Sequence, residues 1–180
     1  MLKKTRRLKT VCMLSLAVMA FTASAQDSVN IKPFERYWTK SRLVSKVGLG
    51  IQETAFVEAG IQLHKIYIHP LSLASAGPYL TVDGLVTDDK LIIGPKLGYE
   101  ITAGLLGIAA DMTYYSDFDR EALVVTPRAG ISILGFVNLF YGRNISLSDF
   151  QFDAIDKNRF SLVFNLNRDY FNLRNAPKGP

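Results

Sequence analysis

The stretch LIIGPKLGYEITAGLLGIAADMTYYS, residues 91–116, decides the fold, because apolar and polar residues alternate along it. Ile93 and Leu97 fall on one face of an extended strand. Lys96 and Glu100 fall on the opposite face and are separated there by a glycine. Alternation with a period of two indicates a β-strand with one apolar and one polar face. A tight turn in the middle of the stretch then predicts a β-hairpin.

The same alternation continues through most of the chain, from residue 42 to residue 167. Most of the strands it predicts have about the ten residues that a tilted strand needs to cross a hydrocarbon core. The connections between them are mostly short, which forces neighbouring strands to pair antiparallel. The sequence therefore predicts an all-β fold, a closed up-and-down antiparallel β-barrel of about eight strands. The eight candidate strands are 43–52, 54–67, 78–86, 91–102, 104–115, 122–133, 135–146 and 159–168.

The N-terminal segment has the three parts of a secretory signal peptide. Basic residues at 3–9 precede an apolar run at 11–21 that is too short to span a bilayer as a helix. Ala23-Ser24-Ala25 then forms a small-residue cleavage site, so we expect the mature chain to start at Gln26. This divides the chain into four predicted parts. They are a signal peptide at 1–25, a lead-in at 26–41, a barrel at 42–168 and a polar tail at 169–180.

Cleavage changes the charge and the thiol content of the chain. Of the 21 Lys and Arg residues, five lie in the signal, which has no acidic residue, so 16 basic residues remain against 16 acidic ones. A chain this close to neutral gives no argument for nucleic-acid binding. The single cysteine, Cys12, also lies within the signal. We therefore expect no disulfide and no thiolate metal site in the mature chain.

Two kinds of barrel fit an alternating sheet. A soluble lipocalin-like barrel turns its apolar face inward, whereas a membrane barrel turns that face to lipid. The polar face here carries about one charge per strand, balanced in sign, with glycine between the charges. The narrow interior of an eight-stranded barrel suits this composition, because opposite charges can pair across it. The pattern favours the membrane orientation. The interior charge network that it predicts consists of Lys46, Glu58, His64, Lys96, Glu100, Asp111 and Arg128.

Three other features bear on the architecture. Basic-x-Gly triplets at 46–48, 96–98 and 128–130 each precede a tight turn, which suggests a repeated hairpin unit. Equivalent hairpins need their turns on the same side of the barrel, but the strand count puts the first turn on the opposite side. Either the strand at 78–86 is assigned wrongly, or residues 29–38 contribute a further strand. Pro95 and Pro127 lie inside predicted strands and require bulges or an interface. Aromatic residues near the predicted strand ends are typical of membrane girdles. They are Tyr79, Tyr99, Tyr114, Tyr115, Tyr141, Phe160, Tyr170 and Phe171.

The signal, the hairpin meander and the final strand FSLVFNL, residues 160–166, resemble small outer-membrane β-barrels of the OmpA/OmpX type. The segments PKLGYE (95–100) and PRAGIS (127–132) are similar to strands of uncharacterised outer-membrane proteins from Bacteroidetes-like bacteria. The resemblance implies export to the bacterial outer membrane as a monomer. The implied partners are outer-membrane lipid, lipopolysaccharide and the barrel-assembly machinery. The polar tail from residue 172 departs from the terminal aromatic residue common in such barrels.

Candidate sites for chemistry are few. His69 and Ser72 could belong to a lipid-A-modifying enzyme, but no carboxylate stands near them to orient a base, so we expect no enzyme. Asp88-Asp89 and Asp117-Phe118-Asp119 lack the spacing of a calcium loop, so we expect no metal and no cofactor. The charge network could conduct ions or close the barrel, and a packed lumen favours closure. The expected role is structural or interactive, with a soluble periplasmic lipocalin-like barrel as the alternative.

Overall fold

The computed structural model describes residues 38–69, 72–87, 90–148, 150 and 152–167. All of them belong to the compact unit Arg36–Pro180. The expected signal peptide, most of the lead-in and the C-terminal tail lie outside the described residues. No helix that is long and apolar enough to cross a membrane occurs in the part of the chain that the structure describes.

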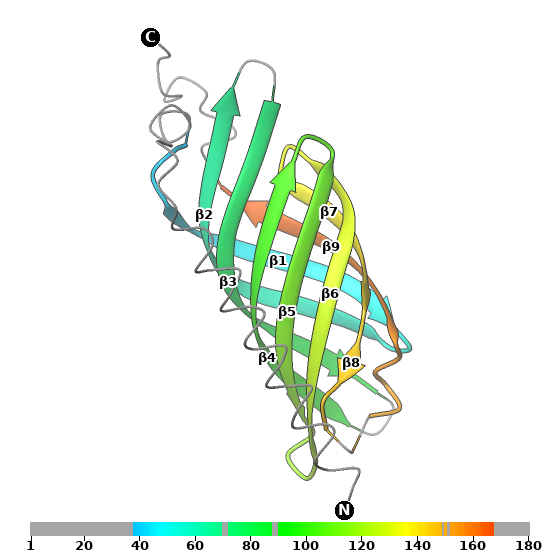
Figure 1. Ribbon diagram of the computed structural model, residues 1–180. Coiled ribbons are helices and arrows are strands. Elements are labelled where there is room, and N and C mark those ends of the chain that lie inside the picture. The colour runs from blue at the N-terminus through cyan, green and yellow to red at the C-terminus, as the bar shows by residue number, and fades with distance from the viewer. Residues whose placement is uncertain (1–37, 70–71, 88–89, 149, 151, 168–180) are drawn as a thin grey trace, which may run out of the picture. The chain divides into compact units, whose positions relative to one another are not determined.

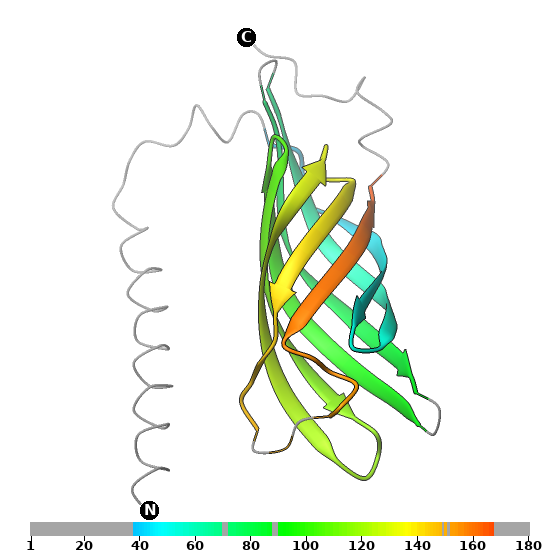
Figure 2. The ribbon, with the colours of Figure 1, turned by 90° about the vertical axis from the view of Figure 1, so that its right-hand side faces the viewer.

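The predicted fold class is confirmed. Eight antiparallel strands form a closed up-and-down barrel, and a ninth short strand, β8, pairs only with β6 (Figure 1). Consecutive strands pair with each other around the barrel, and β9 closes it by pairing with β1 (Figure 2). The strands are β1 (Arg42–Gln52), β2 (Ala55–His69), β3 (Ser72–Val86), β4 (Leu91–Ala103), β5 (Leu106–Ser116), β6 (Glu121–Ile133), β7 (Val137–Arg143), β8 (Ile145–Ser146) and β9 (Asn158–Leu166).

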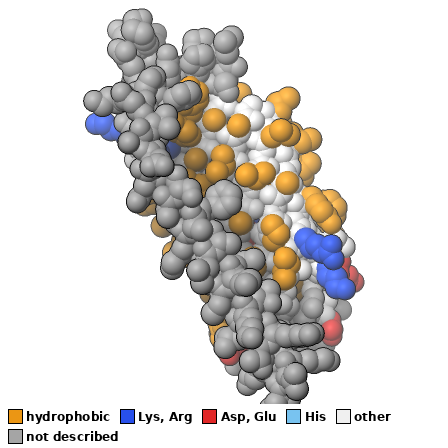
Figure 3. Space-filling view, viewed as in Figure 1, with side chains coloured by type: hydrophobic (Ala, Val, Ile, Leu, Met, Phe, Trp, Pro, Cys, Tyr) orange, Lys and Arg blue, Asp and Glu red, His pale blue; other side chains and the backbone are white. Residues whose placement is uncertain are grey.

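The two faces of the strands have opposite burial. Along β5, every second residue from Leu106 to Tyr114 is exposed, and the residues between them are buried. The exposed positions are the apolar ones, and Figure 3 shows apolar side chains spread over the visible wall. Lys46, Lys96 and Arg128 are instead buried, at 0 to 3% exposure. The apolar face therefore points away from the barrel axis and the charged face points toward it.

The two ends of the barrel differ in their connections. At one end, β4 joins β5 and β6 joins β7 through tight turns, and β1 begins and β9 ends there as well (Figure 1). We call this the short-turn end. Gly104 and Gly135 have positive φ values of 59° and 71° in these turns, a conformation in which glycine has no steric penalty. The opposite end, which we call the loop end, carries the connections at 87–90 and 117–120 and the long segment between β7 and β9.

The long segment folds back onto the barrel. Phe152, Ala154 and Ile155 are buried and join an apolar cluster with inward residues such as Phe56 and Leu85. Phe150 packs against this cluster and meets the Phe152 ring edge-on, at 4.9 Å between centroids. The side chains of Phe152, Ala154 and Ile155 are therefore covered.

The prolines interrupt hydrogen bonding without shifting the strands. The β4–β5 pairing is continuous except at Gly94 and Pro95, and the register on the two sides of this gap is the same. The pairing of β6 with β7 and β8 likewise skips Pro127 and then resumes in register. Pro78 stands at a third gap, between β2 and β3. The expected bulges are therefore absent at these described positions, because each proline removes a donor but inserts no residue.

The inequivalent turns noted in the sequence have a simple cause. The third strand is real and begins at Ser72, so residues 72–77 extend it beyond the predicted start. The triplet at 46–48 lies on β1, which runs opposite to β4 and β6, where the other two triplets lie. Its turn is therefore at the loop end, and the suggested repeat of equivalent hairpins is wrong. Within the described part of the lead-in, Trp38 contributes only an isolated bridge to Tyr67.

Candidate functional site

The candidate site is the polar interior of the barrel, and glycine makes room for its large side chains. Tyr79 and Tyr115 were expected in an outer aromatic girdle, but their exposures are 2% and 0%, and both point inward. A Cβ at Gly98 would overlap the Tyr79 ring, and a Cβ at Gly94 would lie 2.6 Å from the Tyr115 ring. Large inward side chains therefore fit only because the facing strand carries glycine, which explains why glycine is frequent inside these strands.

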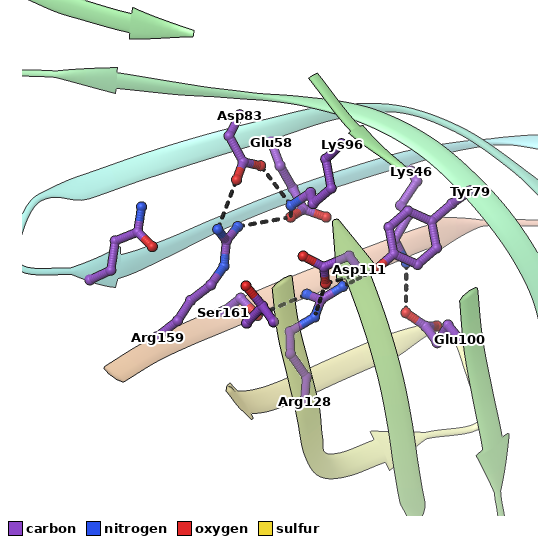
Figure 4. Close-up of polar contacts among 12 residues, drawn as sticks. Lys46, Glu58, Tyr79, Asp83, Lys96, Glu100, Asp111, Arg128, Arg159 and Ser161 are labelled. Carbon is purple, nitrogen blue, oxygen red and sulfur yellow. Dashed lines mark hydrogen bonds and ion pairs between the residues drawn. The ribbon is translucent and has the colours of Figure 1, made fainter. Parts of the chain in front are cut away.

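The first interior cluster joins residues of five strands near the loop end. Lys96 of β4 forms ion pairs with Glu58 of β2 and with Asp83 of β3, where Nζ lies 2.6 Å from Oδ1. Arg159 of β9 approaches the same two carboxylates, with Nη1 2.8 Å from Asp83 Oδ2 and Nη2 3.4 Å from Glu58 Oε2 (Figure 4). Tyr115 donates to Asp83 over 2.9 Å and accepts from Arg159 over 2.7 Å. Two acids and two bases thus share one hydrogen-bonded group.

The second cluster lies between β5 and β6. Arg128 Nε is 2.8 Å from Asp111 Oδ2, an ion pair without hydrogen-bond alignment. The Arg128 guanidinium also donates to the Tyr79 hydroxyl and, over 3.3 Å, to Ser161 Oγ. Tyr79 in turn donates to Asp111 over 3.0 Å, so the acid, the base and the phenol form a triangle (Figure 4).

The third cluster lies toward the short-turn end. Lys46 Nζ is 2.7 Å from Glu100 Oε2 and donates to Asn165 Oδ1 over 2.8 Å. The other carboxylate oxygen of Glu100 accepts from Asn165 over 2.7 Å and from Asn138 over 3.0 Å. Lys46 also lies over the Tyr79 ring, 4.7 Å from its centroid, which places this cluster next to the second one.

The three clusters balance in charge. Each contains as many acids as bases, and every member is at most 3% exposed. An unpaired charge in such surroundings costs several kcal/mol, so the pairing is a condition for burying these groups at all. Lys46 and Glu100, like Arg159 and Asp83, come from strands that are not neighbours, so these two contacts also require the barrel to be closed. The arrangement can fill and rigidify the interior.

The seven residues expected to form the charge network all lie inside the barrel, but not as a single network. The structure brings six of them together as the pairs Lys46–Glu100, Glu58–Lys96 and Asp111–Arg128. His64 is buried among polar neighbours and its Nδ1 lies 3.1 Å from Asn167 Nδ2.

Sequence reasoning missed Asp83 and Arg159, which complete the first cluster. The signal for both was present, because Leu80 and Val82 were placed on the apolar face and Asp83 therefore falls on the other face. The same alternation from Phe160 places Arg159 inward. Both residues stand close to predicted strand ends, where an assignment to a loop is equally natural.

Outside the interior, candidate sites for chemistry remain weak. The side chains of His69 and Ser72 lie outside the described residues, although their backbones pair in the β2–β3 hairpin. No group of three or more His, Cys, Asp or Glu side chains able to hold a metal occurs among the described residues.

Asp117 organises the connection between β5 and β6. Its carboxylate accepts hydrogen bonds from the backbone N–H of Arg120 over 2.7 Å and of Asp119 over 3.2 Å, and it pairs with Lys90 over 3.1 Å. Burial by itself raises the pKa of this carboxyl, but these hydrogen bonds outweigh burial and hold the pKa well below its ordinary value. The neighbouring Phe118 has a positive φ of 71° and is 79% exposed. Asp117 therefore acts as an internal brace of this loop.

Comparison with known protein families, with curated proteins and with solved structures found no match. The fold and the site therefore carry the classification. They define a closed eight-stranded antiparallel β-barrel with an apolar outer face and three neutral clusters of buried charge.

Proposed function

We propose that this chain is a small barrel of a bacterial outer membrane, with a structural or interaction role and an interior closed by its charge clusters. The observation that carries the proposal is the exposed apolar face. Leu97, Leu139 and Ile108 are more than half exposed and have many equally exposed apolar neighbours. Soluble monomers rarely expose contiguous apolar surface beyond a few hundred Å², so a face of this extent calls for a hydrocarbon environment.

The extent of the apolar face supports the proposal. On β2, the outward residues from Ala55 to Leu63 are all apolar, and the first outward charge is Lys65. Nine residues at about 3.4 Å each, tilted by about 40°, span roughly 23 Å, close to the apolar band of membrane barrels. Among the described positions of the other strands, the exposed charged residues are Arg42, Glu121 and Arg143, and each stands at a strand end.

The two ends of the barrel support one orientation. Outer-membrane barrels have short periplasmic turns and longer extracellular loops. The short-turn end, where the first strand begins and the last strand ends, fits the periplasmic side. The loop end carries the long segment between β7 and β9 and fits the outside.

The interior supports a closed barrel over a conducting one. Side chains of an eight-stranded barrel are just large enough to fill its interior. Here three hydrogen-bonded clusters follow one another along the axis, and the apolar cluster around Phe152 and Ile155 adds a further layer at the loop end. A role as a rigid membrane element suits this filling better than solute passage.

The alternatives are less well supported. A soluble lipocalin-like barrel needs an apolar interior for its ligand, whereas the described interior carries charged side chains. A lipid-A-modifying enzyme is the other alternative, and we propose a role without catalysis. Replacing His69 or Ser72 with alanine is then expected to leave the lipid profile of the membrane unchanged. Loss of an acyl modification would favour the enzyme.

Cysteine labelling tests the membrane proposal directly. In a background with Cys12→Ser, single cysteines replace Leu139, which is 52% exposed, Asn138, which is fully buried, and Phe118 in a loop. In intact outer membranes, we expect a water-soluble maleimide to label the Phe118→Cys variant only. A maleimide soluble in the bilayer should label the Leu139→Cys variant. Rapid labelling of Leu139→Cys by the water-soluble reagent, on protein found in the soluble fraction, would overturn the proposal.

A further inference from the structure

The outer face of β1 and β2 changes character at the short-turn end. Leu43 and Leu63 pair across the two strands and are both exposed. Beyond them β2 continues past the start of β1, as the projecting hairpin at the upper end of Figure 1 shows, and Trp38 and Thr39 lie against this extension. The residues at this extension are basic and aromatic, whereas Leu43 and Leu63 are aliphatic.

Two hydrogen bonds and one ring contact join Trp38 and Thr39 to β2. The backbone N–H of Thr39 donates to the Ile66 carbonyl over 2.8 Å, and the Ile66 N–H donates to Thr39 Oγ1 over 3.1 Å. The next residues along, Trp38 and Tyr67, form an antiparallel bridge, and their rings lie 5.4 Å apart between centroids. Trp38 and Thr39 are therefore fixed against the outer edge of the β2–β3 hairpin.

This geometry sets two lysines side by side. Lys65 precedes Tyr67 by two residues on β2, so strand alternation places it on the face that carries the two rings. Lys40 directly follows Thr39, which is hydrogen-bonded to Ile66, so Lys40 lies close to Lys65 along the two antiparallel segments. Both are exposed, and neither forms an ion pair with a described residue. Like charges close to each other are unfavourable, which favours an anionic partner. We call Trp38, Lys40, Lys65 and Tyr67 the basic-aromatic patch.

We propose that the basic-aromatic patch binds the headgroup of an anionic phospholipid, with the acyl chains lying along the apolar face below it. This inference rests on the proposed function, because it places the patch at the periplasmic edge of the band, where the leaflet consists of phospholipid. Charge complementarity selects the ligand: Lys40 and Lys65 offer two adjacent cations to one phosphate. Tyr and Trp side chains suit the headgroup level, and lysines at the edge of an apolar band extend toward it.

Two exposed cations at the opposite end of the barrel are arranged differently. There the exposed cations Lys90 and Arg120 already pair with Asp117, and Lys90 also lies 3.6 Å from Asp119. A phosphate approaching them would meet these carboxylates. Lys40 and Lys65 differ from these two cations because neither lysine pairs with an acidic side chain among the described residues.

Trp38 is the only tryptophan of the chain, so its fluorescence reports on the patch. Protein isolated from the membrane in detergent, with its N-terminus determined, is inserted into phosphatidylcholine vesicles. One set carries phosphatidylglycerol with brominated acyl chains, and the other carries the same fraction of brominated phosphatidylcholine. We expect brominated phosphatidylglycerol to quench more strongly, with a relative association constant on the order of tenfold. Equal quenching by the two lipids would overturn the inference.

A pair of double variants separates the patch from general charge. Lys40→Gln with Lys65→Gln should abolish the preference for phosphatidylglycerol. Arg143→Gln with Lys157→Gln, exposed residues on the loop side, removes the same charge and should keep it. A preference retained in the first variant, or lost equally in both, would contradict the site. Labelling of the Leu139→Cys variant in the same vesicles reports insertion, so a failure to insert counts against the proposed function and a lost preference after insertion counts against this site alone.

Discussion

The inner and outer faces of the same strands follow opposite rules. On β4, Lys96 and Glu100 point inward and each finds a partner of opposite charge at defined distance. Leu97 and Ile101, their neighbours in sequence, point outward and are about half exposed. In soluble barrels, apolar side chains point inward and charged side chains point outward. Both faces belong to the same strands, so the surroundings of each face must determine which side chains it carries.

The two faces also differ in how specific their interactions are. Apolar burial is non-directional and roughly proportional to area, so one outward aliphatic residue can replace another at little cost. The inner contacts depend on charge, distance and hydrogen-bond direction, and each cluster loses its balance when one member is removed. We therefore expect substitutions on the inner face to have the larger effects.

The largest expected effect comes from breaking an inner cluster. Arg159→Met leaves Asp83 and Glu58 with Lys96 as their only cation in this cluster, which should lower the free energy of unfolding by about 3–5 kcal/mol. Urea unfolding in detergent micelles measures the change. Arg143→Met is the control, because Arg143 is exposed on the outer face and should cost less than about 0.5 kcal/mol. Equal costs for the two would mean that the interior is well solvated.

A charge on the outer face should have the next largest effect. Leu97→Arg places a cation in the middle of the apolar band, with an expected cost of about 2–4 kcal/mol in a bilayer. Leu105→Arg is the control, because Leu105 lies in the turn between β4 and β5, is 70% exposed and should tolerate arginine. Reversible unfolding in lipid vesicles compares the two. If Leu97→Arg is as mild as its control, water covers this face and the membrane assignment fails.

A smaller effect is expected where the inner face is crowded. A methyl group at Gly98 would overlap Tyr79, so Gly98→Ala should cost about 1–3 kcal/mol through overpacking. At Gly84, on the outer face of β3, an added Cβ meets only Val57 Cγ2 at an ordinary 3.7 Å, so Gly84→Ala should be nearly neutral. Urea titration of both variants distinguishes them. A neutral Gly98→Ala would show that Tyr79 has room to move away.

The contrast between the faces explains what the sequence could predict. Strict alternation is independent of tertiary detail. It located the strands within about two residues except at β3 and at the predicted strand 135–146, which the structure divides into β7 and β8. There the added residues 72–77 include Ala74, Ala76 and Gly77, which have little β-propensity, so tertiary pairing with β2 sets the strand start. Alternation also placed Lys46 and Arg128 inward. One face of the predicted strands carries no charged residue, so the charged residues must lie on the opposite face.

Partner choice inside the barrel could not be read from the sequence. Arg159 meets Asp83 because β9 and β3 face each other across the interior, which depends on closure and on the size of the side chains between them. Tyr115 follows Tyr114 directly, so aromatic content near a strand end did not say which of the two points inward. The burial of Phe152 by the barrel mouth likewise follows from loop folding, for which no periodic signal exists.

The smallest expected effect concerns the loop end. One loop there contains a paired and hydrogen-bonded acid, like the acids of the barrel interior. Asp117 is paired and hydrogen-bonded like an interior acid, and its lowered pKa gives its contribution a definite pH dependence. A carboxyl whose pKa is lower in the folded loop stabilises that loop fully above the unfolded pKa of about 3.9. The contribution is lost only as the pH falls below that value and through the lower folded pKa. The loop should therefore stay ordered at mildly acidic pH.

Trypsin cleavage after Arg120 measures this order, because the cleaved bond lies beside the hydrogen bonds to Asp117. Asp117→Ala should speed cleavage at neutral pH several-fold while leaving the barrel folded. Asp119→Ala is the matched control, since its carboxylate is 80% exposed and meets only Lys90, at 3.6 Å, so cleavage should be little changed. Equal acceleration by the two variants would mean that net charge, not the hydrogen bonds of Asp117, holds the loop. This outcome would mean that specific charge pairing and hydrogen bonding matter only inside the barrel and not in this loop.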